Sequence, residues 1–113
     1  MFRNPVLTGF HPDPSILRVG ADYFMTTSTF ALFPGLPIYH SRDLQNWNLL
    51  GHALSRRSQM EMRTTDPNGG IYAPTLRHWK GTFYLTSCCL HKRGTPFGPN
   101  VSDVVRCRHV DCD

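Results

Sequence analysis

The sequence has little charge and no long apolar run. Charged residues make up 18% of the 113 residues, and no stretch approaches the roughly 20 consecutive apolar residues that a membrane-spanning helix needs. The basic residues are scattered, and no basic run is longer than Arg56-Arg57 or Lys92-Arg93. The net charge of +4 therefore does not indicate a nucleic-acid partner, and nothing in the sequence predicts a membrane partner.

Cysteine is absent before Cys88, and the other three cysteines are Cys89, Cys107 and Cys112. Disulfide-stapled secreted domains distribute their cysteines along the whole chain, so we expect free thiols here. The opening residues, Met-Phe-Arg-Asn-Pro, also lack the apolar centre of a signal peptide. Together these features predict a cytoplasmic protein.

Apolar residues are nevertheless abundant. Hydrophobic residues make up 40% of the chain and aromatic residues 12%, which is the composition of a chain that buries a core. Nine glycines and nine prolines lie between the short apolar runs and do not form one biased tract. This spacing predicts many short strands joined by turns, and hence an all-β fold.

The sequence repeats itself at an offset of sixty positions. Pro14-Ser15-Ile16 recurs as Pro74-Thr75-Leu76, and the Tyr-Phe-Met-Thr-Thr of residues 23–27 recurs as the Phe-Tyr-Leu-Thr-Ser of residues 83–87. Each copy predicts a hairpin, because two runs rich in β-branched and aromatic residues flank a short turn.

The first copy continues for two more predicted strands, whereas the second copy loses the pattern after Leu90. Four antiparallel strands repeated at this period are typical of a β-propeller blade, within which Trp47 and Trp79 are expected to pack. We therefore predict an all-β, incomplete propeller over residues 1–90 and an irregular tail over residues 91–113. A complete small β-sandwich with a coincidental repeat is the alternative. The predicted strands are residues 16–19, 23–28, 36–40, 47–50, 75–79 and 82–85.

One carboxylate, Asp13, lies between two prolines at the entrance to the first predicted strand. Pro12 fixes its own φ, and Pro14 disfavours the α region for Asp13, so we expect an extended backbone that aims the carboxylate. Such pre-orientation favours catalysis. A rigid turn with no catalytic role has the same local pattern, so the local chemistry alone does not separate the two interpretations.

Asp13 also belongs to a series of motifs that resembles the opening of the family 43 glycoside hydrolases. The series covers residues 4–90 and keeps the family's order. It implies that the chain is the N-terminal part of a five-bladed β-propeller enzyme of the β-xylosidase or α-L-arabinofuranosidase type. The motifs are Asn-Pro-Val-Leu at 4–7, His-Pro-Asp-Pro-Ser at 11–15, Thr-Ser-Thr-Phe at 27–30, Phe-Pro-Gly at 33–35, His-Ser-Arg-Asp-Leu-Gln-Asn-Trp at 40–47 and Gly-Gly-Ile-Tyr-Ala-Pro at 69–74.

The resemblance implies an inverting hydrolysis of a glycosidic bond. In that reaction a base carboxylate deprotonates the attacking water, and an acid roughly 6.5–9.5 Å away protonates the leaving oxygen. Asp13 matches the family's general base. The family's acid is a glutamate much later in the chain, so these residues alone are expected to be inactive. Glu61, the only glutamate, does not match that acid and is expected to be a solvated or structural carboxylate.

Four further residues fall where the resemblance implies contact with the sugar. Phe30 and Tyr72 match the aromatic walls of the pocket for the terminal sugar, and flat rings suit the apolar face of a pyranose. Phe33 is expected to border the same pocket, and His11 either lines it or is a structural histidine. Core packing is the alternative for the aromatic residues.

Three other interpretations stay open. The chain either binds sugar without catalysis through Phe30 and Tyr72, or is an unstable propeller fragment whose blade faces are uncovered. We expect no metal and no organic cofactor, and a xylo-oligosaccharide or an arabinosyl sugar as the partner. A zinc module is disfavoured because its candidate ligands lack the Cys-x2-4-Cys pairs of structural zinc sites. These candidate ligands are Cys88, Cys89, His91, Cys107, His109 and Cys112.

Overall fold

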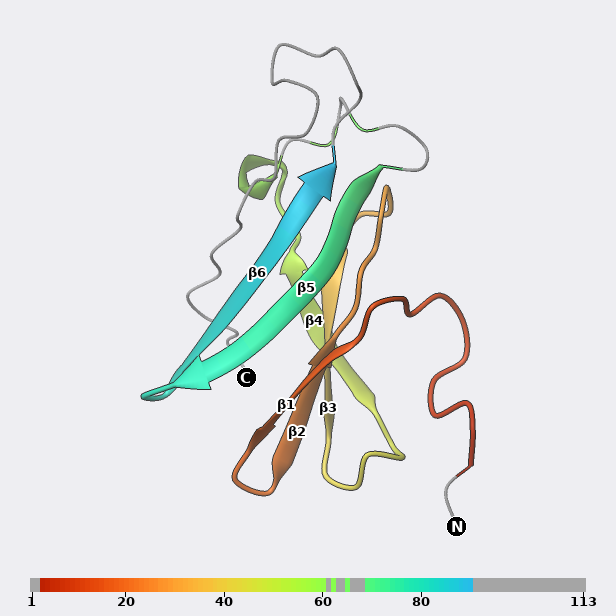
Figure 1. The fold of residues 1–113 in the computed structure, drawn as a ribbon, viewed down its shortest axis with the longest axis vertical. Helices are drawn as coiled ribbons and strands as arrows, with labels where there is room; N and C mark the ends of the chain where they lie inside the picture. Colours follow the sequence, from red (N-terminus) through yellow and green to blue (C-terminus); the bar gives the residue numbers. More distant parts are fainter. Residues whose placement is uncertain (1–2, 61, 63–64, 66–68, 91–113) are drawn as a thin grey trace.

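The computed structural model describes residues 3–60, 62, 65 and 69–90. These residues form two antiparallel sheets and one short 3-10 helix, which confirms the prediction of an all-β fold (Figure 1). None of the described elements is a helix long and apolar enough to cross a membrane. The elements are β1 (Ser15–Val19), β2 (Asp22–Thr26), β3 (Gly35–Ser41), β4 (Asn48–Leu54), the helix η1 (Arg57–Gln59), β5 (Gly70–Trp79) and β6 (Thr82–Leu90).

Strands β1 to β4 form a four-stranded meander in which each strand pairs with the next along the chain. The first hairpin closes at the Val19–Asp22 pair, around a turn in which Gly20 has a φ of 61°. Glycine adopts that left-handed conformation without steric cost, so the turn falls where the sequence predicts it. β4 runs past its predicted end at residue 50, because Leu54 is fully buried opposite Gly35.

Strands β5 and β6 form the second sheet, a hairpin that repeats the first one sixty residues later. Its closing pair is Trp79–Thr82, which is the counterpart of Val19–Asp22 in the first hairpin. The repeat seen in the sequence is therefore a repeat of structure. The described residues hold four strands of the first copy and two of the second, as the sequence predicts.

β5 is longer than its predicted range, because it begins at Gly70 and not at residue 75. The sequence did not predict this extension because of Pro74, since proline donates no hydrogen bond to a ladder and normally marks the end of a strand. The structure accommodates Pro74 through a shift of register between Tyr72 and Thr75.

The core lies between the two sheets, where β5 contacts β1, β2 and β3 (Figure 1). Phe24 of β2 and Phe83 of β6 meet across this interface with their ring centroids 4.8 Å apart and edge to face. Both sheets contribute to one cluster, so each buries its inner face against the other. The buried members of the cluster are Leu36, Ile38, Leu54, Met60, Ile71, Leu76, Leu85 and Cys89.

The two tryptophans differ from each other in exposure. Trp79 is 61% exposed at the end of β5, with the Lys80 ammonium 4.3 Å from its ring centroid. The prediction that Trp79 packs inside a blade is therefore wrong, because most of this side chain is exposed. Trp47 is half-buried, and its indole N–H donates to the Leu44 carbonyl at 3.1 Å.

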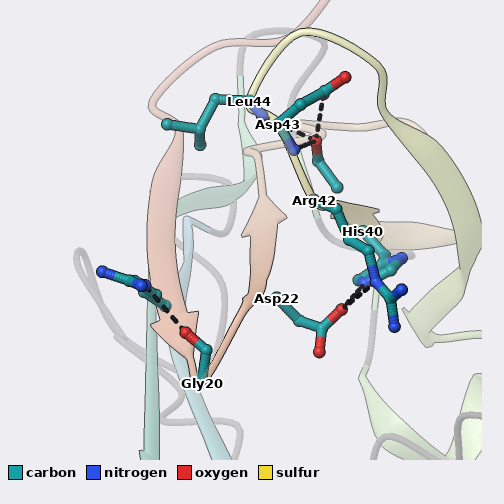
Figure 2. Close-up of polar contacts among 8 residues, drawn as sticks. Gly20, Asp22, His40, Arg42, Asp43 and Leu44 are labelled. Atoms are coloured by element: carbon teal, nitrogen blue, oxygen red, sulfur yellow. Dashed lines mark hydrogen bonds and ion pairs between the residues drawn. The ribbon is translucent and has the colours of Figure 1, made fainter.

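Polar contacts join the start of β2 to the end of β3 (Figure 2). The Asp22 carboxylate accepts a hydrogen bond from His40 Nε2 at 2.7 Å and one from Arg42 Nε at 3.1 Å. These two donors, with His40 first, lower the pKa of Asp22 below its ordinary value of 3.8.

A second carboxylate closes the turn between β3 and β4. Asp43 Oδ1 accepts from the backbone N–H groups of Asn46 at 2.7 Å and Gln45 at 2.9 Å, and the Asn46 side chain donates to Oδ2 at 2.6 Å. These hydrogen bonds favour the ionised form, so they hold the pKa of Asp43 far below its ordinary value of 3.8. The Asp43 backbone N–H also bonds to the Ser41 hydroxyl (Figure 2).

Replacing Gly70 by alanine is predicted to destabilise the chain strongly. Gly70 has a φ of 109°, and a Cβ there would collide with the Phe30 carbonyl. We expect Gly70→Ala to lower the free energy of unfolding by at least about 1–3 kcal/mol. Gly51→Ala is the matched control, because Gly51 lies in β4 with open space around its Cβ position. Urea unfolding of both variants measures the effect, and equal midpoints would contradict it.

The stability of the chain is predicted to depend on the charge of Asp43. Because its folded-state pKa lies below the unfolded value, its stabilising effect is complete above about pH 4 and is lost as the pH falls through the folded-state pKa. Asp43→Asn keeps an acceptor oxygen but does not titrate. We therefore expect the variant to be less stable than the wild type at pH 7, and the difference to shrink below about pH 4. Urea titrations at several pH values test this, and a constant difference would disprove it.

Candidate active site

Asp13 lies at the entrance to β1 with its side chain exposed. Its φ is 50°, so the predicted extended backbone is wrong. Pro14 disfavours the right-handed α region but does not by itself force an extended chain, and aspartate visits the left-handed region more readily than most residues. The segment that follows β2 contacts Asp13 and stabilises this conformation. The spacing of residues in the sequence does not reveal these contacts.

Those contacts come from Ser28, which follows β2 and is fully buried. Its hydroxyl donates to Asp13 Oδ2 at 2.7 Å, and its backbone N–H donates to the Pro12 carbonyl at 2.9 Å. Asp13 Oδ1 has no hydrogen-bond partner among the described residues. Oδ2 is therefore held by Ser28, whereas Oδ1 has no such partner. The sequence interpretation missed Ser28, although it lies inside the Thr-Ser-Thr-Phe motif.

The second sheet contacts Ser28 through Ala73 of β5. The Ala73 backbone N–H donates to the Ser28 hydroxyl at 2.7 Å, across 45 positions of sequence. Ala73 has a φ of 41° and lies within the register shift of β5. The irregularity in β5 thus falls at the residue whose backbone N–H bonds to Ser28.

Three aromatic rings, Phe10, Phe30 and Tyr72, form a cluster in the segments that carry Asp13, Ser28 and Ala73. The ring centroids of Phe30 and Tyr72 are 4.3 Å apart, and those of Phe10 and Phe30 are 5.3 Å apart. Phe30 and Tyr72 are half-buried and Phe10 is 56% exposed, so none of the three is sealed in the core. The structure brings the two predicted rings together and adds Phe10, which precedes the His-Pro-Asp-Pro-Ser motif.

His11 is held on both sides of its ring. Its Nε2 donates to the Thr8 carbonyl at 3.1 Å, and its Nδ1 accepts from the Tyr39 hydroxyl at 3.4 Å. The rings of His11 and Tyr39 also meet edge to face at 5.6 Å, and burial raises the pKa of Tyr39. Because both ring nitrogens are hydrogen-bonded within the protein, His11 has the contacts of a structural histidine. Only the face of its ring could contact a sugar.

The remaining candidates are Phe33, Glu61, and the cysteines and histidines considered for zinc. Phe33 is 39% exposed and lies outside the ring contacts of the cluster. The Cys88 thiol donates to the Tyr72 carbonyl at 3.7 Å, and the described residues contain no group of three or more side chains that would hold a metal. Glu61, His91, Cys107, His109 and Cys112 lie outside the described residues.

The arrangement suits chemistry on a neutral, ring-shaped substrate. Asp13 is exposed, and its Oδ1, which has no partner among the described residues, is able to accept a proton from water. The neighbouring rings offer flat apolar faces of the kind on which sugars stack. A held, exposed carboxylate beside aromatic rings is typical of glycoside hydrolases, whose reaction needs a carboxylate on each side of the glycosidic bond.

Comparison with known proteins defines the family. The sequence profile of glycosyl hydrolases family 43 matches residues 2–105, so the chain belongs to this family. The chain is 59% identical over 85 residues to a non-reducing end α-L-arabinofuranosidase of Bacteroides ovatus, covering 74% of this chain and 16% of the relative. It is 55% identical over 89 residues to a xylan 1,3-β-xylosidase of a Vibrio species, covering 79% of this chain and 17% of the relative.

Solved structures give the same answer for the fold. A xylan β-1,4-xylosidase from Bacillus halodurans superimposes with a TM-score of 0.79 at 42% identity, over 94% of this chain and 23% of that chain. A family 43 protein of Bacteroides ovatus superimposes with a TM-score of 0.77 at 53% identity, over 83% of this chain and 19% of that chain. The chain therefore spans less than a quarter of the length of these relatives.

Proposed function

We propose that this chain supplies the base-bearing part of an inverting glycoside hydrolase that acts on β-xylosides or α-L-arabinofuranosides. The observation that carries the proposal is Asp13, an exposed carboxylate with one oxygen held by Ser28, in a chain whose neighbouring segments bring together the rings of Phe10, Phe30 and Tyr72. The xylosidase and arabinofuranosidase names of the relatives support the substrate class.

In the proposed reaction, Asp13 Oδ1 takes a proton from the water that attacks the anomeric carbon. A second carboxyl group, roughly 6.5–9.5 Å from Asp13, protonates the leaving oxygen. The described residues offer only Asp22 and Asp43 as further carboxylates, and both are engaged in hydrogen bonds that stabilise the meander. The acid therefore comes from outside these residues.

The proposal places residues 1–90 at the start of a five-bladed propeller, with residues 91–113 outside the repeat. The meander β1–β4 is then the first blade, and β5–β6 is part of the second. Two features support this arrangement, namely the structural repeat at sixty residues and the exposure of Trp79.

The chain alone is predicted to show negligible turnover of nitrophenyl xyloside and arabinofuranoside, because it lacks the acid. General acid catalysis contributes about 10²–10⁴-fold to such rates. Release of nitrophenol by the isolated chain that disappears in Asp13→Asn would contradict this prediction.

A chimera tests the base itself. Residues 3–90 of this chain replace the matching segment of the Bacteroides ovatus α-L-arabinofuranosidase, which supplies the remaining propeller. We expect the chimera to be active and Asp13→Asn to lower its kcat by about 10²-fold or more. Asp22→Asn removes a comparable carboxylate away from the rings and is expected to keep kcat. An inactive parent chimera, or an active Asp13→Asn chimera, would overturn the proposed function.

Sugar binding without catalysis is a second candidate, and the half-exposed ring cluster favours it. If it holds, the isolated chain binds xylose weakly, and Phe30→Leu abolishes the heat of binding measured by calorimetry because the flat ring is lost. Trp79→Leu removes an exposed ring distant from Asp13 and serves as the control. Equal heats for the two variants would exclude the cluster as the binding surface.

A further inference from the structure

The direction of the Ser28 hydroxyl is fixed by its two partners. A backbone N–H only donates, so Ser28 Oγ accepts from Ala73 at 2.7 Å. The hydroxyl has a single proton, and that proton therefore points to Asp13 Oδ2, also at 2.7 Å. Ser28 is fully buried, so no water competes for either position. The hydroxyl is a directed link from the backbone of β5 to the carboxylate.

Ser28 also holds the backbone that carries Asp13. Its N–H donates to the carbonyl of Pro12, the residue immediately before Asp13. A non-glycine residue with a φ of 50° persists only where its surroundings impose that conformation. One buried residue thus contacts Asp13 through both the main chain and the side chain.

Neighbouring hydroxyls do not share this arrangement. Thr26 and Thr27 are as fully buried as Ser28, yet their hydroxyls have no hydrogen-bond partner in the described part of the chain. A general need for polar residues in this segment therefore does not explain the hydroxyl of Ser28. Its two short hydrogen bonds distinguish it from hydroxyls one and two residues away.

From this geometry we infer that Ser28 is a positioning residue. Its hydrogen bond occupies Asp13 Oδ2, so that Oδ1 is the oxygen that activates water. The inference rests on the proposed function of Asp13 as the base. Because Ala73 follows Tyr72 directly, the same hydroxyl fixes the carboxylate relative to the ring cluster. The water and the sugar are thereby placed against each other by one link between the two sheets.

The first test uses the 113-residue chain and does not depend on activity. Side-chain coupling constants measured by NMR report whether Asp13 holds one χ1 rotamer. We expect one rotamer in the wild type and in Thr27→Val, and averaging among rotamers in Ser28→Ala, together with faster amide exchange at Ala73. Ser28→Thr keeps a hydroxyl and is expected to restore both readings. A single Asp13 rotamer in Ser28→Ala would overturn the inference.

The second test is kinetic and uses the chimera described above. Ser28→Ala is expected to lower kcat by about 10²-fold with little change in KM, because misplacing the base affects the chemical step more than sugar binding. Ser28→Thr should recover most of kcat, and Thr27→Val should leave both constants unchanged. If Ser28→Ala prevents folding, Ser28→Cys, which keeps the size but donates weakly, replaces it in both tests.

The outcomes distinguish a failure of the proposed function from a failure of the positioning role of Ser28. An inactive parent chimera removes the proposed function, while the rotamer measurement still decides whether Ser28 holds Asp13. An active parent with an unchanged kcat in Ser28→Ala overturns the positioning role alone. A loss of kcat that Thr27→Val reproduces overturns it too, because the effect would then belong to packing in this segment.

Discussion

The joint between the two sheets is the constraint on which the site depends. The Phe30 N–H donates to the Ile71 carbonyl at 3.0 Å, and the Ile71 N–H returns a hydrogen bond to the Phe30 carbonyl at 2.9 Å. This pair brings the segment after β2 against the start of β5. Gly70 permits the approach, since any side chain there would meet the Phe30 backbone. The ring contact of Phe30 with Tyr72 and the link from Ala73 to Ser28 both follow from this joint.

The joint also explains why the site is exposed while its supports are buried. Ser28 and Ile71 have no exposed surface, whereas Asp13 and Phe10 reach solvent from the loop that precedes β1. Buried hydrogen bonds exclude competing water and are therefore well defined in direction. A carboxylate supported in this way stays solvated and still has a fixed orientation. Such preorganisation is what catalysis by a general base requires.

Much of this arrangement was predictable from the sequence, because it is written in local patterns. The hairpins follow from alternating apolar residues and from glycine turns, and the sixty-residue offset locates both copies. The proline-flanked Asp13 was also visible in the local sequence, whereas Phe30 and Tyr72 were predicted only through the resemblance to family 43. The left-handed backbone of Asp13 was not predicted, because rules for the residue before proline describe a local preference that distant contacts override. Ser28 was overlooked since its role depends on a partner 45 positions away. Trp79 was misassigned because an aromatic strand residue predicts burial only where a second surface covers it.

Core packing between the two sheets sets the distance between Asp13 and the ring cluster. Asp13 lies in the loop that leads into the first sheet and Tyr72 lies in the second sheet, so their separation is set by core packing and not by either sheet alone. Leu76 reinforces this packing, since its side chain is fully buried and its N–H donates to the Ser15 hydroxyl at 3.0 Å. A change in the core that slides β5 along β1 would move the ring cluster away from the base without touching either. Because shifts of about 1 Å cost rate more readily than they cost folding, residues of the core would contribute to the rate of the proposed reaction without contacting the substrate.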